Sequence, residues 1–71
     1  MTIERELAIR FFEADGLEAD IVEAKLFNPN VPGLEIKWVQ RGVMPDGGDN
    51  AGTYRASFEQ MFARINNPRP Q

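Results

Sequence analysis

The sequence predicts a small α+β domain with two helices packed on one face of an antiparallel sheet. Three observations predict this fold: an alternating apolar–polar hairpin at residues 21–41, an apolar helical stripe before it, and a second helical stripe after it. A chain of 71 residues forms one domain with one small core. We therefore predict a single domain at residues 1–67 and a flexible C-terminal tail at residues 68–71.

The first predicted helix covers about residues 3–14, with Thr2 as its N-cap. Gly16 is placed to end the helix in a left-handed conformation, which would bring Leu17 into contact with Phe12. The main apolar stripe consists of Ile3, Leu7, Phe11 and Ala14. Ile9 and Phe12 lie off this stripe. One interpretation is that the helix is deeply embedded or that Phe12 is absorbed by its C-terminal contact. The other is that the helix has a second apolar face that meets another chain.

Both arms of the hairpin alternate between apolar and polar residues, around a turn with two prolines and a glycine at residues 28–33. We predict that Lys25 lies opposite Glu35 and that Glu23 lies opposite Lys37. A slip by one residue would turn one apolar set toward water, and a slip by two would oppose like charges. The same register predicts two further pairs, Val22 with Trp38 and Ile21 with Val39.

Residues 42–52 are rich in glycine, aspartate and asparagine, which predicts a loop. Asp46, Asp49 and Asn50 are possible calcium ligands, but their spacing does not match an EF-hand, and no phosphate-binding motif follows Gly47-Gly48. We interpret the segment as a flexible hairpin loop, most mobile at residues 45–51.

Two interpretations exist for residues 53–56. Thr53 either caps a helix that begins at Tyr54, or residues 52–56 form a short third strand before a capping box of Ser57 and Gln60. We favour the strand. A terminal helix follows in both cases and ends before Pro68. The predicted core is Leu7, Phe11, Val22, Leu26, Leu34, Ile36, Trp38, Phe58, Phe62 and Ile65.

Composition excludes several kinds of function. The chain has no cysteine and no histidine, so it lacks thiolate metal sites, the usual general base and the commonest metal ligand. Its net charge of −3 disfavours binding to nucleic acid. An acidic run at residues 13–23 is either a solvated connector or a landing site for a basic partner. With no membrane-length apolar run and no signal-peptide pattern, we expect a cytoplasmic protein.

No cofactor or metal is predicted, and an enzyme is disfavoured because a small core leaves little room for a water-excluding pocket. We expect a small protein-interaction module: an adaptor, inhibitor or regulatory subunit, of the kind that phages and other mobile elements encode. The alternative is a building block that associates with copies of itself. The hypothesised contact residues are Phe12, Ile21 and Val39: Ile21 and Val39 form an apolar spot rimmed by charge on the free sheet face, and Phe12 of the first helix joins it near the same edge.

Overall fold

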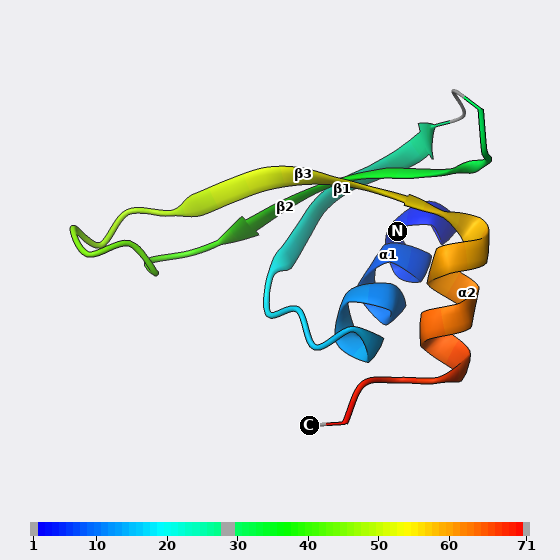
Figure 1. Ribbon diagram of the computed structural model, residues 1–71. Coiled ribbons are helices and arrows are strands. Elements are labelled where there is room, and N and C mark those ends of the chain that lie inside the picture. The colour runs from blue at the N-terminus through cyan, green and yellow to red at the C-terminus, as the bar shows by residue number, and fades with distance from the viewer. Residues whose placement is uncertain (1, 28–29, 71) are drawn as a thin grey trace.

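The computed structural model describes residues 2–27 and 30–70. The elements follow in the order α1 (Ile3–Ala14), β1 (Asp20–Phe27), β2 (Gly33–Gln40), β3 (Asn50–Ser57) and α2 (Phe58–Asn66). The strands form one antiparallel sheet in the order β1-β2-β3. Both helices lie on the same side of this sheet (Figure 1), which confirms the predicted fold class. The third strand is also confirmed, and it is longer than the predicted 52–56.

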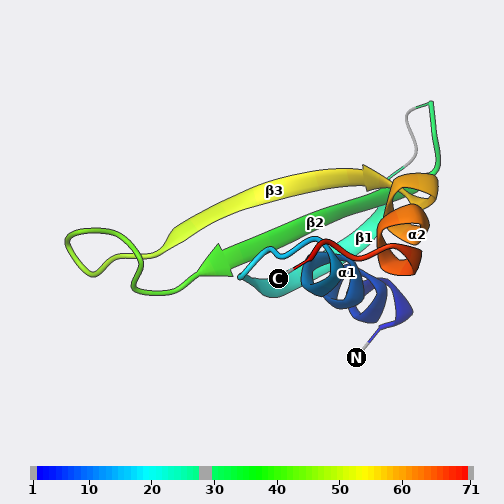
Figure 2. The same ribbon diagram turned by 60° about the horizontal axis from the view of Figure 1, so that its bottom comes forward.

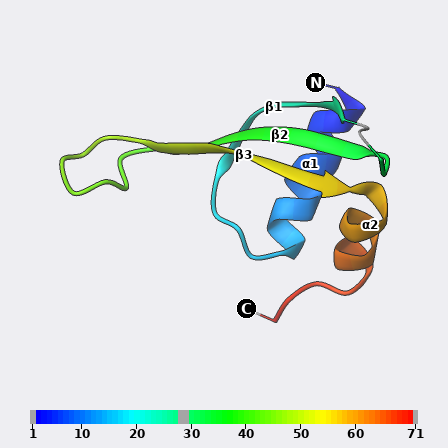
Figure 3. The same cartoon turned by 45° about the horizontal axis from the view of Figure 1, so that its top comes forward.

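The β2–β3 loop extends away from the helices in all three ribbon views (Figures 1, 2 and 3). Its backbone turns at Gly42 and Gly47, whose φ angles of 68° and 83° are left-handed and suit glycine. The predicted mobility of this loop stays a prediction.

Neither helix in the described part of the chain is long and apolar enough to cross a membrane.

The first helix, α1, begins and ends as its sequence predicts. The Thr2 hydroxyl accepts a hydrogen bond from the Arg5 N–H at 3.1 Å and caps α1. At the other end, Gly16 is left-handed, with a φ of 74°. The Leu17 N–H donates to the Phe12 carbonyl at 2.9 Å, which completes the Schellman ending.

The capping box of α2 is half formed. The Ser57 hydroxyl accepts a hydrogen bond from the Gln60 N–H at 3.0 Å, as predicted. The Gln60 side chain does not return to the cap in the structure; its amide donates to the Tyr54 hydroxyl at 3.3 Å. The start of α2 is held to the β1–β2 connection by the Phe58 N–H, which donates to the Pro32 carbonyl at 3.0 Å.

The predicted hairpin register is confirmed for one half of β1 and wrong for the other. Glu23 pairs with Lys37 and Lys25 pairs with Glu35, but a β-bulge separates Ile21 from Glu23. The extra residue is Val22, so Ile21 pairs with Trp38, and Asp20 pairs with Val39. Ile21 is consequently buried at 5% exposure, whereas Val22 is 58% exposed.

The core lies between the sheet and the helices. It consists of Ala8, Phe11, Phe12, Ile21, Leu34, Ile36, Ala56 and Met61. Leu7, Trp38, Phe58 and Ile65 pack against it and are partly buried, so these predictions hold in part. The predictions are wrong for Val22, Leu26 and Phe62, which are 58%, 68% and 50% exposed. The bulge turns Val22 out of the core, and Leu26 lies near the end of an edge strand.

The described C-terminal residues contact α1, and the predicted flexibility of residues 68–71 stays a prediction. The Arg69 N–H donates to the Ala14 carbonyl at 2.9 Å, and the Arg69 side chain donates to the Asp15 carboxylate at 2.8 Å. Asp15 also forms an ion pair with Arg64 of α2 at 2.9 Å. The end of α1 therefore meets α2 and the tail at a single carboxylate. The domain prediction for the last residue, Gln71, lies outside the described residues.

Candidate functional site

The exposed apolar spot predicted from Phe12, Ile21 and Val39 does not exist. Phe12 and Ile21 belong to the core at 3% and 5% exposure, and Val39 is 8% exposed. Ile21 and Val39 are not cross-strand partners, because the bulge at Val22 shifts the register. Phe12 of α1 is therefore buried within the chain's own fold and is not part of an exposed second apolar face. The edges of the Phe12 ring meet the Phe11 and Tyr54 rings at centroid distances of 6.0 and 5.8 Å.

Val39 differs from the other two residues because it is buried outside the main core. By strand alternation it lies on the face of β2 opposite Trp38. It sits on the central strand, with Asp20 on one side and Ala51 on the other. Lysine at position 39 would therefore destabilise the fold, because it would place a charge at a buried position.

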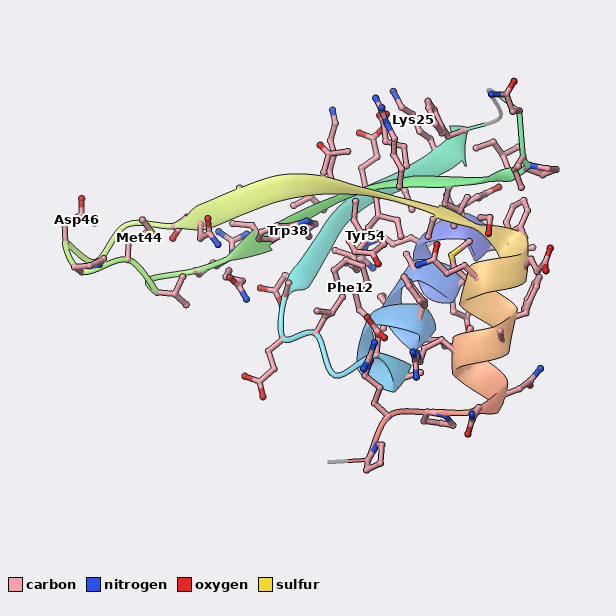
Figure 4. All side chains as sticks on the ribbon, in the orientation of Figure 1. Phe12, Lys25, Trp38, Met44, Asp46 and Tyr54 are labelled. Atoms are coloured by element: carbon pink, nitrogen blue, oxygen red, sulfur yellow. The ribbon has the colours of Figure 1, made fainter. Side chains whose placement is uncertain are left out.

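An apolar depression lies on the helical side of the sheet, and we call it the apolar slot. Its volume is about 110 Å³. It is lined by Phe12, Leu17, Ala19, Trp38, Gln40 and Tyr54. Figure 4 shows Trp38, Tyr54 and Phe12 below the sheet, on the side of the helices, with Lys25 on the opposite side. The slot thus combines α1, the α1–β1 connection and the two strands β2 and β3.

Hydrogen bonds fix the rim of the slot. The Gln40 side-chain amide donates to the Glu18 carbonyl at 2.8 Å and ties the end of β2 to the α1–β1 connection. The same Gln40 side chain accepts a hydrogen bond from Asn50 of β3 at 3.0 Å. Leu17 is positioned by the Schellman ending of α1. These hydrogen bonds therefore link β2, β3 and the α1–β1 connection around the slot.

The position of Trp38 depends on a glycine in the neighbouring strand. Trp38 pairs with Gly52 of β3, and a Cβ atom at position 52 would lie 2.7 Å from the indole ring. Any larger residue there would displace the indole. Gly52 thus lets the Trp38 ring approach β3 closely, where the ring forms one wall of the slot.

Leu17 and Ala19 also line a wider hollow of about 640 Å³ beside the slot. Its remaining lining residues are Glu13, Gly16, Glu18 and Pro70. The slot and this hollow together therefore contain two carboxylates and no basic side chain among their lining residues. A third hollow, on the β1 side of Leu17, carries both signs of charge because Arg5 and Arg41 line it with Glu13 and Asp20.

The free face of the sheet carries a row of paired charges. Glu35 of β2 contacts Lys25 of β1 at 3.5 Å and Arg55 of β3 at 3.0 Å. The Arg55 guanidinium also lies over the Phe27 ring, 4.4 Å from its centroid. The hydrogen bond from Arg55 is the main cause that lowers the pKa of Glu35 below its ordinary value of 4.5, and the charge of Lys25 adds to it. These charges satisfy one another within the fold.

Groups with catalytic potential are engaged in structural roles. Tyr54 and Ser57 serve the α2 cap, as their hydrogen bonds to Gln60 show. A polar pocket of about 330 Å³ lies beside Tyr54 and contains Asp15. Its carboxylate is held by Arg64 and Arg69 at 2.9 and 2.8 Å, so it is poorly placed to act as a base.

The aspartates of the β2–β3 loop hydrogen-bond to their own loop. Asp49 accepts from the Gly42 N–H at 2.9 Å, and Asp46 accepts from the Gly48 N–H at 2.8 Å. Across residues 2–27 and 30–70, no cluster of three or more acidic side chains could hold a metal ion. Figure 4 places Met44 and Asp46 in the projecting loop, remote from the apolar slot.

The sequence patterns do not predict the apolar slot as a site, although they predict one of the contacts that form it. The predicted contact between Leu17 and Phe12 identifies two of its walls. The opposite wall requires the pairing of Trp38 with Gly52, which depends on the long third strand.

Comparisons with family models, with curated proteins and with solved structures find no match for this chain.

Proposed function

We propose that this chain is a small non-enzymatic protein-interaction module, an adaptor, inhibitor or regulatory subunit that acts in the cytoplasm. Its binding surface in this proposal is the apolar slot. The single observation that supports the proposal is a preformed apolar depression with a half-buried tryptophan and tyrosine in its walls. Tryptophan and tyrosine are the side chains most enriched at the energetic centres of protein interfaces.

The proposal is tested by comparing two alanine-to-arginine variants in affinity capture. Ala19→Arg places a long cationic side chain at the rim shared by the slot and its neighbouring hollow. Ala63→Arg makes the same change at an exposed position of α2 and is the matched control. We expect a partner captured from the native host by the unchanged chain and by Ala63→Arg, and lost with Ala19→Arg.

Leu17→Ala provides a second, milder change at the slot, for the case in which Ala19→Arg does not fold. The measurement is quantitative mass spectrometry of the captured proteins, with circular dichroism to establish that each variant is folded. A partner retained by both folded slot variants would refute this binding surface.

A second candidate function is self-association through the edge of β3. This edge spans eight residues and contains a single charged side chain, Arg55. The opposite edge is less suited to pairing, because the bulge interrupts β1 and the Arg5 side chain occupies the Ile21 carbonyl at 3.1 Å. Two β3 strands could pair antiparallel about a two-fold axis at Thr53, which sets each Arg55 opposite Ala51 of the other strand.

Light scattering after size-exclusion chromatography tests this second candidate. Thr53→Glu sets a carboxylate opposite Lys37 within one chain, which suits the monomer. In the β3–β3 dimer the same change would bring two carboxylates together near the symmetry axis. A dimer that Thr53→Glu converts to monomer supports this candidate, whereas a monomer at all concentrations excludes it.

A further inference from the structure

We propose that the partner presents a short segment with one aliphatic side chain flanked by lysine or arginine. The aliphatic side chain occupies the apolar slot, and a flanking cation lies over the hollow lined by Glu13 and Glu18. This inference rests on the proposed function and names the chemistry of its partner.

The size of the slot selects the anchor. A cavity of about 150 Å³ accommodates a benzene molecule. The slot, at about 110 Å³, is smaller and suits the side chain of leucine, isoleucine or valine rather than an indole. Its lining is almost entirely apolar. Gln40 is the only amide side chain among the lining residues, and the others are Phe12, Leu17, Ala19, Trp38 and Tyr54. Because Gln40 is already hydrogen-bonded to Glu18 and Asn50, a polar anchor would find few partners there.

The charge beside the slot selects the flanking residues. Asp15 and Asp20 of the acidic run are paired with arginines within the chain, at 2.8–2.9 Å for Asp15 and at 3.7 Å for Asp20. Within residues 2–27 and 30–70, Glu13 and Glu18 have no such ion pair, and both are exposed. They line the hollow that shares Leu17 and Ala19 with the slot. A ligand anchored in the slot therefore meets two available carboxylates.

The whole chain favours the same ligand chemistry. Its net charge is −3, which attracts a cationic segment and repels the phosphates of nucleic acid. Opposite charges at the rim of an interface chiefly raise the association rate and select the partner, while the buried anchor supplies affinity. The apolar slot and the acidic hollow thus fit these two roles.

The position of Trp38 supplies a direct readout, because it is the only tryptophan in the chain and lines the slot. Three synthetic ten-residue peptides in a glycine–serine background serve as probes. The first has a central leucine with a lysine on each side, the second replaces the leucine with serine, and the third replaces both lysines with glutamate. Tryptophan emission is followed as each peptide is added at low ionic strength.

We expect the leucine–lysine peptide to change Trp38 emission in a saturable manner. The serine and glutamate peptides should each bind at least about tenfold more weakly, since one lacks the buried anchor and the other opposes the carboxylates. Added salt should weaken the binding of the first peptide, because it screens the exposed charges.

Matched variants test which carboxylates contribute to peptide binding. The double variant with Glu13→Gln and Glu18→Gln should bind the leucine–lysine peptide several-fold more weakly. The pair Glu23→Gln and Glu59→Gln removes the same net charge on the free sheet face and on α2, and should leave binding nearly unchanged.

Equal binding of the three peptides, or equal loss with both pairs of variants, would overturn the inference. Absence of peptide binding while Ala19→Arg still abolishes capture of a partner would refute the partner chemistry alone. Absence of both effects would refute the proposed function as well.

Discussion

At the scale of single residues, Glu35 organises the free face of the sheet. Its carboxylate lies between Lys25 and Arg55 in a row that crosses all three strands. The side chain of Glu35 is only 13% exposed, whereas both cations are more than half exposed. Replacement of Glu35 would leave two cations without their shared partner, so Glu35 is the residue of this row on which stability depends most.

Glu35→Gln should therefore destabilise the fold at neutral pH, and its effect should depend on pH. Because the folded-state pKa of Glu35 is lowered from 4.5, its carboxylate stabilises the fold above that pH. This stability is lost as the pH falls through the lowered pKa. Denaturant unfolding from neutral pH down to acid should show the two proteins converging at low pH. A constant difference at every pH would contradict the role of the carboxylate, and Glu23→Gln is the control.

At the scale of elements, the bulge in β1 decides which side chains enter the core. One extra residue at Val22 allows Ile21 to pair with Trp38 and still leaves Glu23 opposite Lys37. Both the charge pairing of the hairpin and the burial of Ile21 are thereby satisfied. A regular strand with the same charge pairs would pair Val22, and not Ile21, with Trp38.

The bulge predicts that Ile21→Ala destabilises the fold more than Val22→Ala does. A regular hairpin would give the reverse order. Ile21→Ala should cost about 2–5 kcal/mol of unfolding free energy, because it leaves a cavity in the core. Val22→Ala should change stability by less than about 0.5 kcal/mol, because the side chain is exposed. Urea denaturation of both variants measures the difference. A larger loss for Val22→Ala would place Val22 in the core and refute the bulge.

The β2–β3 loop gives a second prediction at this scale. Asp46 and Asp49 each accept a backbone hydrogen bond within the loop. Asparagine retains the accepting oxygen, so the double change of both aspartates to asparagine should shift stability by less than about 0.5 kcal/mol. Calcium titration monitored by melting temperature should have no effect on either protein. A calcium-dependent rise that the double variant loses would instead establish a metal site in the loop.

Elements defined by local chemistry are predictable from this sequence, and features that depend on packing between elements are not. Thr2, Gly16 and Ser57 mark helix ends correctly because capping involves residues only a few positions apart. The charges of Glu23, Lys25, Glu35 and Lys37 predict their own pairing. The bulge is not visible in the alternation, because Val22 and Ile21 are both apolar. The slot depends on Trp38 and Gly52 from different strands, which local patterns do not bring together.

At the scale of the whole molecule, the C-terminal segment closes the fold. Arg69 reaches across 54 positions of sequence to Asp15, while Arg64 of α2 reaches the same carboxylate. The Arg69 N–H also satisfies the Ala14 carbonyl, one of the carbonyls left open at the end of α1. A small domain without disulfides gains from such a link, because its core alone supplies little stability.

A double-mutant cycle on Asp15 and Arg69 tests this closure. Asp15→Asn and Arg69→Ala should each destabilise the chain, and the double variant should lose less than the sum. We expect a coupling energy of about 0.5–1 kcal/mol, because Asp15 is half-buried but Arg69 is exposed. Glu6 and Arg10 on the exposed face of α1 form the control pair, with a coupling of about 0.3–0.5 kcal/mol. Additive losses for Asp15 and Arg69 would mean that this ion pair does not hold the tail, and would favour the flexible tail that the sequence predicts.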